Sequence, residues 1–148
     1  MNQTPNIAIV SSLFNEHITK RLYKSACRAW QKHYNNDDLP PAYWVPGAVE
    51  LPIMAQWVIQ ANHVDAVICF GAVIQGESSH FDYVCQQVSL GCQTVALKFD
   101  TPIIFGVLTV DNNNQALQRV GGSIGDYGEQ SMLSAIQMYQ NKLSLKEI

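Results

Sequence analysis

His80 is the residue of this chain whose sequence surroundings best suit chemistry. It follows an apolar run and opens a segment with helical character, residues 80–99. Ser79 is predicted to cap that helix, with Asp82 in the place of a capping-box acid. The free amides of a helix start, with Gly76 allowing close backbone approach, make a natural anion site. Because the positive helix end disfavours an imidazolium, a neutral His80 could transfer protons beside a bound anion. The same residues also fit a plain helix start, and the local pattern leaves both interpretations open.

Four more side chains could take part in binding, and each also has an ordinary explanation. Phe14 and Phe105 could stack on a flat heterocycle, or belong to the core. Glu50 could accept hydrogen bonds from a ligand, or be a favourable first-turn acid of a helix. Arg119 could clamp an anionic substrate, or form a surface salt bridge.

Metal and nucleotide motifs find no support in the sequence. His17, His33 and His63 lack paired ligand spacing and are predicted to be solvated, and His80-x-Asp82 has no third ligand nearby. The P-loop pattern is absent, and "GGSIGDYG" (121–128) is not a dinucleotide fingerprint because it does not follow a strand.

The four cysteines show neither a CxxC pair nor zinc-ligand spacing. Cys85 and Cys92 are seven residues apart on a predicted helix, so about 10 Å of axial rise prevents a disulfide. Buried, reduced thiols in a cytoplasmic protein are therefore expected.

Apolar runs and helical periodicity alternate along the chain and predict the elements that would position these residues. The predicted strands are 6–12, 42–46, 65–73 and 102–110. The predicted helices are 16–34, 50–62, 80–99, 113–120 and 129–143. This alternation predicts an α/β fold, a three-layer flavodoxin-like sandwich with a four-stranded parallel sheet and helices on both faces. Ligands bind such sheets at the carboxyl ends of their strands, which is where His80 and Phe14 fall.

Composition limits the class of protein. With 148 residues, of which 47% are hydrophobic and 14% charged, the chain is expected to form a single domain, residues 1–148. A formal net charge of -3 gives no electrostatic case for nucleic acid or a membrane surface as partner. "MNQTPNIAIV" lacks the features of a secretory signal, and "AVICFGAVI" is about half the length that spans a membrane.

Five motifs, in order, resemble the 6,7-dimethyl-8-ribityllumazine synthase family of riboflavin synthesis. They are "LFNEHIT" (13–19), "WVPGAVELP" (44–52), "GAVIQGESSHFDYV" (71–84), "PIIFGVLTVDNNNQALQR" (102–119) and a glycine-rich loop followed by a terminal helix. The resemblance implies a transferase without cofactors. Such an enzyme would condense 5-amino-6-(D-ribitylamino)uracil with 3,4-dihydroxy-2-butanone 4-phosphate to 6,7-dimethyl-8-ribityllumazine, and would release phosphate and water.

The resemblance also implies roles for individual residues. His80 would be the proton donor and acceptor, Phe14 would stack on the pyrimidine, and Phe105 would border the ring site. The pyrimidine edge and the ribityl chain would be held by Ala48, Val49, Glu50, Ala72, Val73 and Ile74. The phosphate would be framed by the backbone amides of Glu77 and Ser78, with Arg119 as its counter-charge.

Some positions depart from the family pattern. Gln75 stands where an arginine is usual, Ser123 and Tyr127 stand where lysines are usual, and Asp126 replaces a common asparagine. A site for a phosphorylated substrate thus has fewer cations around it, and weaker affinity for that substrate is expected.

The resemblance finally implies a homopentamer with active sites shared between subunits. His80 and Arg119 would come from one subunit and Phe105 from the next. Twelve pentamers can form a 60-subunit shell, which a loop 121–128 without insertion favours, and riboflavin synthase is the candidate partner enzyme. Two alternatives stay open, a non-catalytic flavin- or lumazine-binding shell or carrier and a generic mononucleotide binder.

Overall fold

Four parallel strands form the centre of the molecule in the order β2-β1-β3-β4. The computed structural model describes residues 4–146. The strands are β1 (Ile7–Ser12), β2 (Ala42–Val45), β3 (Ala66–Ile74) and β4 (Ile103–Val110). The helices are α1 (Glu16–Tyr34), the 3-10 turn η1 (Ala48–Glu50), α2 (Leu51–Ala61), α3 (His80–Lys98), α4 (Asn113–Gln118) and α5 (Tyr127–Lys146).

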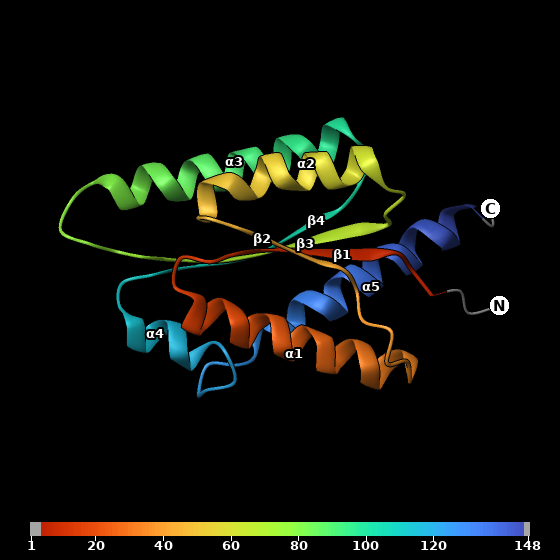
Figure 1. Ribbon diagram of the computed structural model, residues 1–148, viewed down its shortest axis with the longest axis horizontal. Helices are drawn as coiled ribbons and strands as arrows, with labels where there is room; N and C mark the ends of the chain where they lie inside the picture. Colours follow the sequence, from red (N-terminus) through yellow and green to blue (C-terminus); the bar gives the residue numbers. More distant parts are fainter. Residues whose placement is uncertain (1–3, 147–148) are drawn as a thin grey trace.

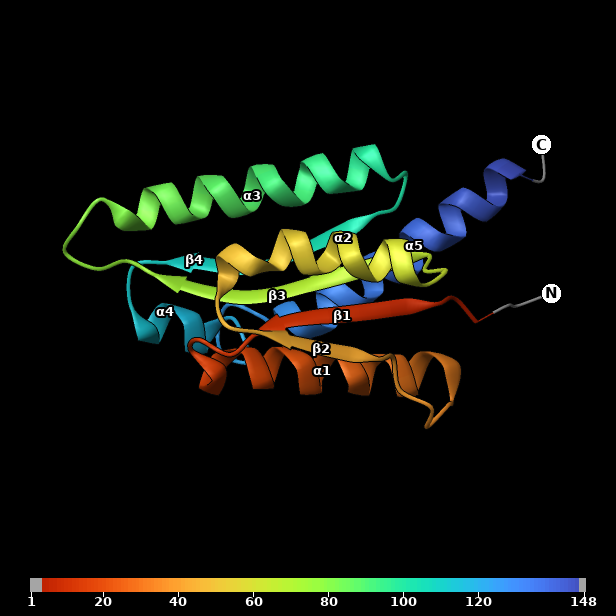
Figure 2. The same cartoon turned by 45° about the horizontal axis from the view of Figure 1, so that its top comes forward.

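Helices cover both faces of the sheet, which confirms the predicted α/β class with a four-stranded parallel sheet (Figure 1). The helices α2 and α3 lie side by side over one face, and α1, α4 and α5 lie over the other. Turning the molecule by 45° shows the same separation (Figure 2). No helix within residues 4–146 is long and apolar enough to cross a membrane.

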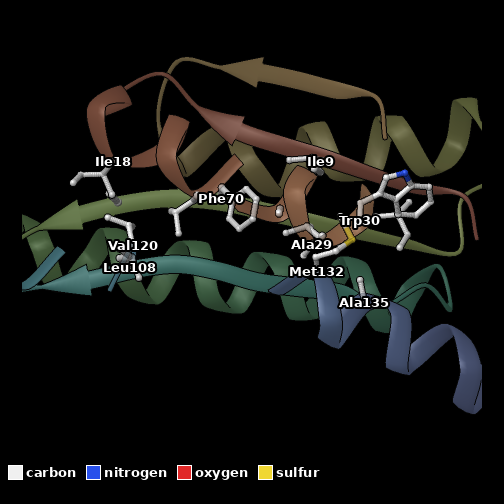
Figure 3. Packing of buried hydrophobic residues seen from close by; sticks show 14 of the residues in the cluster. Ile9, Ile18, Ala29, Trp30, Phe70, Leu108, Val120, Met132 and Ala135 are labelled. Atoms are coloured by element: carbon white, nitrogen blue, oxygen red, sulfur yellow. The ribbon is translucent and has the colours of Figure 1, made fainter. Parts of the chain in front are cut away.

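Two hydrophobic clusters hold these layers together because the inner strands are buried on both faces. Facing α1 and α5, Ile9, Phe70 and Leu108 pack with Trp30 and Met132 (Figure 3). Facing α2 and α3, the second cluster is built from Ala8, Val10, Val45, Leu51, Ala55, Val58, Val67, Cys69, Val88, Cys92 and Val107. The strands β1 and β3 are packed on both faces, which explains their near-continuous apolar runs. Each large apolar side chain buried in this way contributes about 1.5–3 kcal/mol to the stability of the fold.

Helix boundaries follow the predictions with two informative differences. The predicted helix 50–62 is divided into η1 and α2, and Pro52 lies in the first turn of α2, where its missing N–H is tolerated. α5 begins at Tyr127 instead of residue 129. The Asp126 carboxylate accepts a hydrogen bond from the Glu129 amide at 3.2 Å and also from the Ser25 hydroxyl. Asp126, one of the departures from the family pattern, therefore caps α5 and ties it to α1.

Gly91 lies in the middle of α3 because α2 approaches there. A Cβ at this position would lie 2.8 Å from Cγ and 3.0 Å from Cβ of Pro52. A proline ring cannot rotate away, so the absence of a side chain permits the close contact between the two helices.

Gly91→Ala should therefore destabilise the protein, although alanine is the better helix former by about 1 kcal/mol. Overpacking typically costs about 1–3 kcal/mol, which outweighs that gain. Urea unfolding at fixed protein concentration measures the change. The control Ser89→Ala, at an exposed position of the same helix, should be neutral or slightly stabilising. A Gly91→Ala protein as stable as that control would contradict the packing argument.

Candidate functional site

A cavity of about 340 Å³ lies at the carboxyl edge of the sheet, between β1, η1, β3 and α3. It is lined by Phe14, Ala48, Val49, Ala72, Val73, Ile74, Gly76, Ser78, His80, Phe81 and Val84. Eight of the twelve predicted site residues are therefore brought together here. Somewhat larger hollows, of about 460 and 420 Å³, lie at the amino edge around Asn62 and His63. The carboxyl edge is the one at which parallel sheets bind ligands.

Phe14 presents its ring to this cavity from the turn that follows β1. Two backbone bonds hold the turn beside β2, from the Leu13 amide to the Val45 carbonyl at 2.7 Å and from the Phe14 amide to the Pro46 carbonyl at 3.0 Å. The side chain of Phe14 is 69% exposed, so it is not a core residue. A flat ring with an open face at a cavity can stack on a heterocycle.

His80 is the first residue of α3 and is exposed at the cavity. Within residues 4–146 its ring has no hydrogen-bond partner, so both ring nitrogens are available to a ligand. The predicted cap by the side chain of Ser79 is wrong, since Ser79 has helical dihedrals and makes no side-chain cap. Instead the Ser78 hydroxyl accepts a hydrogen bond from the His80 amide at 3.3 Å, because the chain enters the helix one residue earlier.

Glu50 and Glu77 lie next to the cavity without lining it. The Glu50 Oε1 atom accepts a hydrogen bond from the Gly47 amide at 2.9 Å. This bond closes the turn that presents Ala48 and Val49, so Glu50 shapes the cavity wall. Glu77 is exposed in the loop between β3 and α3, beside Ser78.

Phe105 and Arg119 lie outside the cavity of the single chain. Phe105 pairs with Cys69 in the sheet, whereas Val73 of the cavity pairs with Thr109. Four residues of strand separate the two levels, about 13 Å. Arg119 ends α4 on the other side of the sheet, and its Nη1 atom donates to the Gln115 carbonyl at 2.8 Å.

Some contributors were not predicted. Phe81 and Val84 line the cavity from the first turns of α3. Val84 follows Phe81 by three residues and His80 by four, which is the helical spacing that could have identified it. His17 is exposed as predicted, yet its Nε2 atom lies 2.8 Å from Oδ1 of Asn113 and links the starts of α1 and α4.

Cysteines and metals do not explain the site. All four cysteines are free, and Cys85 is only half-buried. A hydrogen bond with Cys92 and complete burial raise the pKa of the Cys69 thiol, and burial raises the pKa of Cys85, so neither is prepared as a thiolate at neutral pH. In the described part of the chain no three His, Cys, Asp or Glu residues are placed to hold a metal ion.

Comparison with known proteins gives one consistent result. Residues 4–142 match the family described as 6,7-dimethyl-8-ribityllumazine synthase. A protein of that name from Coxiella burnetii (strain CbuG_Q212) is 44% identical over 132 residues, 89% of this chain and 87% of the relative. Another of that name, from Cytophaga hutchinsonii, is 44% identical over 145 residues, 92% of this chain and 89% of the relative.

Proposed function

Because the chain belongs to the 6,7-dimethyl-8-ribityllumazine synthase family, we propose that it catalyses the family's condensation through the cavity at the carboxyl edge of the sheet. The substrates are 5-amino-6-(D-ribitylamino)uracil and 3,4-dihydroxy-2-butanone 4-phosphate. The products are 6,7-dimethyl-8-ribityllumazine, phosphate and water, which makes the protein a transferase of riboflavin biosynthesis. All four cysteines are free, which suits the cytoplasm as its location.

The observation that carries this proposal is the meeting of Phe14, the end of β3 and His80 at one cavity. An aromatic plate and apolar walls suit a pyrimidine ring. The strand end and η1 offer backbone groups for its edge and for the ribityl hydroxyls. The positive end of α3, with Ser78 and the backbone of Gly76 at the cavity, suits a phosphate ester.

The reaction needs positioning and proton transfer more than any other help. The 5-amino group of the uracil attacks the ketone, and one water leaves as the imine forms. Phosphate then leaves by elimination, and the nitrogen that carries the ribityl chain closes the ring on the remaining carbonyl with loss of a second water. Each step moves protons among nitrogen, carbon and oxygen atoms, which an unengaged imidazole at position 80 can accept and return. Holding the two substrates together in the cavity contributes an independent part of the acceleration.

His80→Ala should lower kcat by roughly 10²–10⁴-fold while leaving measurable turnover, because positioning is retained. The assay mixes purified protein with both substrates and follows lumazine fluorescence. His63→Ala, which removes an exposed histidine at the other edge of the sheet, is the matched control. Unchanged turnover in His80→Ala would refute the role of this residue. A wild-type protein that binds lumazine without forming it would favour the carrier alternative.

The phosphate end of the site is expected to bind weakly for the family, because Gln75, Ser123 and Tyr127 supply no positive charge. Gln75→Arg should lower the KM for the butanone phosphate by about fivefold, as one added cation near a phosphate contributes about 1 kcal/mol. The charge-matched control Gln60→Arg, at an exposed position of α2, should leave that KM unchanged. Equal effects of the two variants would show that general charge, and not position 75, is responsible.

We propose that the chain works as a homopentamer, with Phe105 completing the cavity of a neighbouring copy. The support is an apolar stripe on the outer side of α3, formed by Tyr83, Leu90 and Leu97, which are 69–74% exposed and seven residues apart. Such spacing is typical of helices that pack on copies of themselves. The pairing of Arg119 with His80 of the same chain, the 60-subunit shell and a contact with riboflavin synthase stay predictions.

Leu90→Lys should therefore break the assembly, because it places a charge in the middle of the apolar stripe. Sedimentation or light scattering should show a shift from a species of pentamer size or larger towards the 16.5 kDa chain. Leu145→Lys is the matched control, since Leu145 on α5 is 70% exposed, close to the 71% of Leu90. An assembly that survives the first substitution as well as the second would contradict the stripe as the interface.

A further inference from the structure

We infer that Asn15 is a positioning residue, whose side-chain amide fastens the turn carrying Phe14 to the end of β3. This inference rests on the proposed function and adds to it a residue that does not line the cavity. The Asn15 Nδ2 atom donates to the Ala72 carbonyl at 2.8 Å, across 57 residues of sequence. Phe14 and Ala72 both line the cavity, so the bond joins two of its walls.

The amide of Asn15 takes over where the ladder between β1 and β3 stops. That ladder reaches as far as the pair Ser11 and Phe70. Beyond it the chain turns towards β2, and the amides of Leu13 and Phe14 donate to carbonyls that follow β2 or end it. The backbone amides that follow β1 thus bond to the β2 side and cannot reach β3. The Ala72 carbonyl of β3 accepts its hydrogen bond from the Asn15 side chain instead. A carbonyl at the end of a buried strand without a donor would be costly.

The backbone conformation of Asn15 does not by itself call for an asparagine, whereas its side-chain hydrogen bond does. It has φ 58 and ψ 43, in the left-handed region that glycine and asparagine tolerate best. It precedes α1, and its carbonyl accepts from the amides of Ile18 and Thr19. Its side chain nevertheless makes no cap for α1 and reaches β3 instead. Glycine would satisfy the dihedrals, but it could not supply the donor.

The consequence for the site follows from the exposure of Phe14. A ring that is 69% exposed gains little from packing, so its place depends on the turn beneath it. With Asn15 the turn is held on the β2 side and the β3 side. Without the Asn15 side-chain amide the turn is held on the β2 side alone, and the Phe14 ring that would stack on the pyrimidine becomes mobile. The loop of residues 75–79, at the phosphate end, is a separate segment and should be unaffected.

The experiment compares Asn15→Gly and Asn15→Asp with Asn35→Gly in the whole protein. Glycine keeps the left-handed conformation and removes the donor, whereas aspartate replaces the donor with a carboxylate that the Ala72 carbonyl repels. Asn35 is the matched control, because it ends the same helix α1 with φ 48 and makes no side-chain hydrogen bond within residues 4–146. The measurements are the KM for each substrate, kcat, the melting temperature, and hydrogen exchange of the amides of Leu13 and Phe14.

We expect the KM for the aminouracil to rise about tenfold in Asn15→Gly, and at least as much in Asn15→Asp, because one hydrogen bond to a partly buried carbonyl is lost. The KM for the butanone phosphate should stay within about twofold. Exchange of the two amides should accelerate by about the same tenfold factor. Asn35→Gly should match wild type in all of these.

Three results would overturn the inference. The first is an Asn15→Gly protein with unchanged aminouracil KM and unchanged exchange. The second is a proportional change of both KM values, and the third is a fall of kcat that only follows a fall of the melting temperature. A merely structural residue would give the second or the third. If wild type forms no lumazine, the proposed function fails, while amide exchange still tests the clamp by itself.

Discussion

The parallel pairing of β1 with β3 is the constraint on which the rest of the structure depends. The two strands run side by side from Ile7 and Ala66 to Ser11 and Phe70, and both are buried from two faces. Parallel neighbours must end at the same edge, so the turn after β1 and the loop after β3 meet there although about sixty residues of sequence separate them. The aromatic ring and the imidazole could not share a cavity in an antiparallel arrangement of the same two strands, because the two strand ends would then lie at opposite edges.

The two faces of the sheet differ in how their helices pack and in what they leave exposed. On the face covered by α1 and α5 the two helices touch at Gly128, where a Cβ would collide with the Leu22 carbonyl. The face covered by α2 and α3 holds the cavity and leaves the outer side of α3 apolar and uncovered in the single chain. The cavity and the apolar stripe, which we propose to meet substrates and further copies, thus lie on the same side of the sheet.

Local patterns predicted the order and type of the elements well, and long-range relations poorly. The helix 16–34 was predicted to the residue because its apolar positions recur at helical spacing. The runs 65–73 and 102–110 were predicted within one residue because continuous apolar segments indicate buried strands. The cap at Ser79 failed, since Ser78 and Ser79 are equivalent by type and only the path of the chain distinguishes them. By helix propensity alone Gly91 would only weaken its helix, and nothing near it in the sequence indicates the contact with Pro52. Likewise, the levels of Phe105 and Val73 along the sheet depend on register, which motif spacing does not encode.

The helix α3 connects assembly with the site. It is a single element of 19 residues, whose first turns hold His80, Phe81 and Val84 at the cavity and whose outer side carries Tyr83, Leu90 and Leu97. A helix moves as a unit, so packing its stripe against other copies would also fix the direction in which the imidazole points. Pro52 against Gly91 holds the same helix from the inside. In the proposed pentamer, α3 would therefore be restrained on both sides. The neighbouring copy that supplies Phe105 would then also help to fix the shape of the cavity. A catalyst that relies on holding two substrates in place has a physical reason to be made only as an assembly.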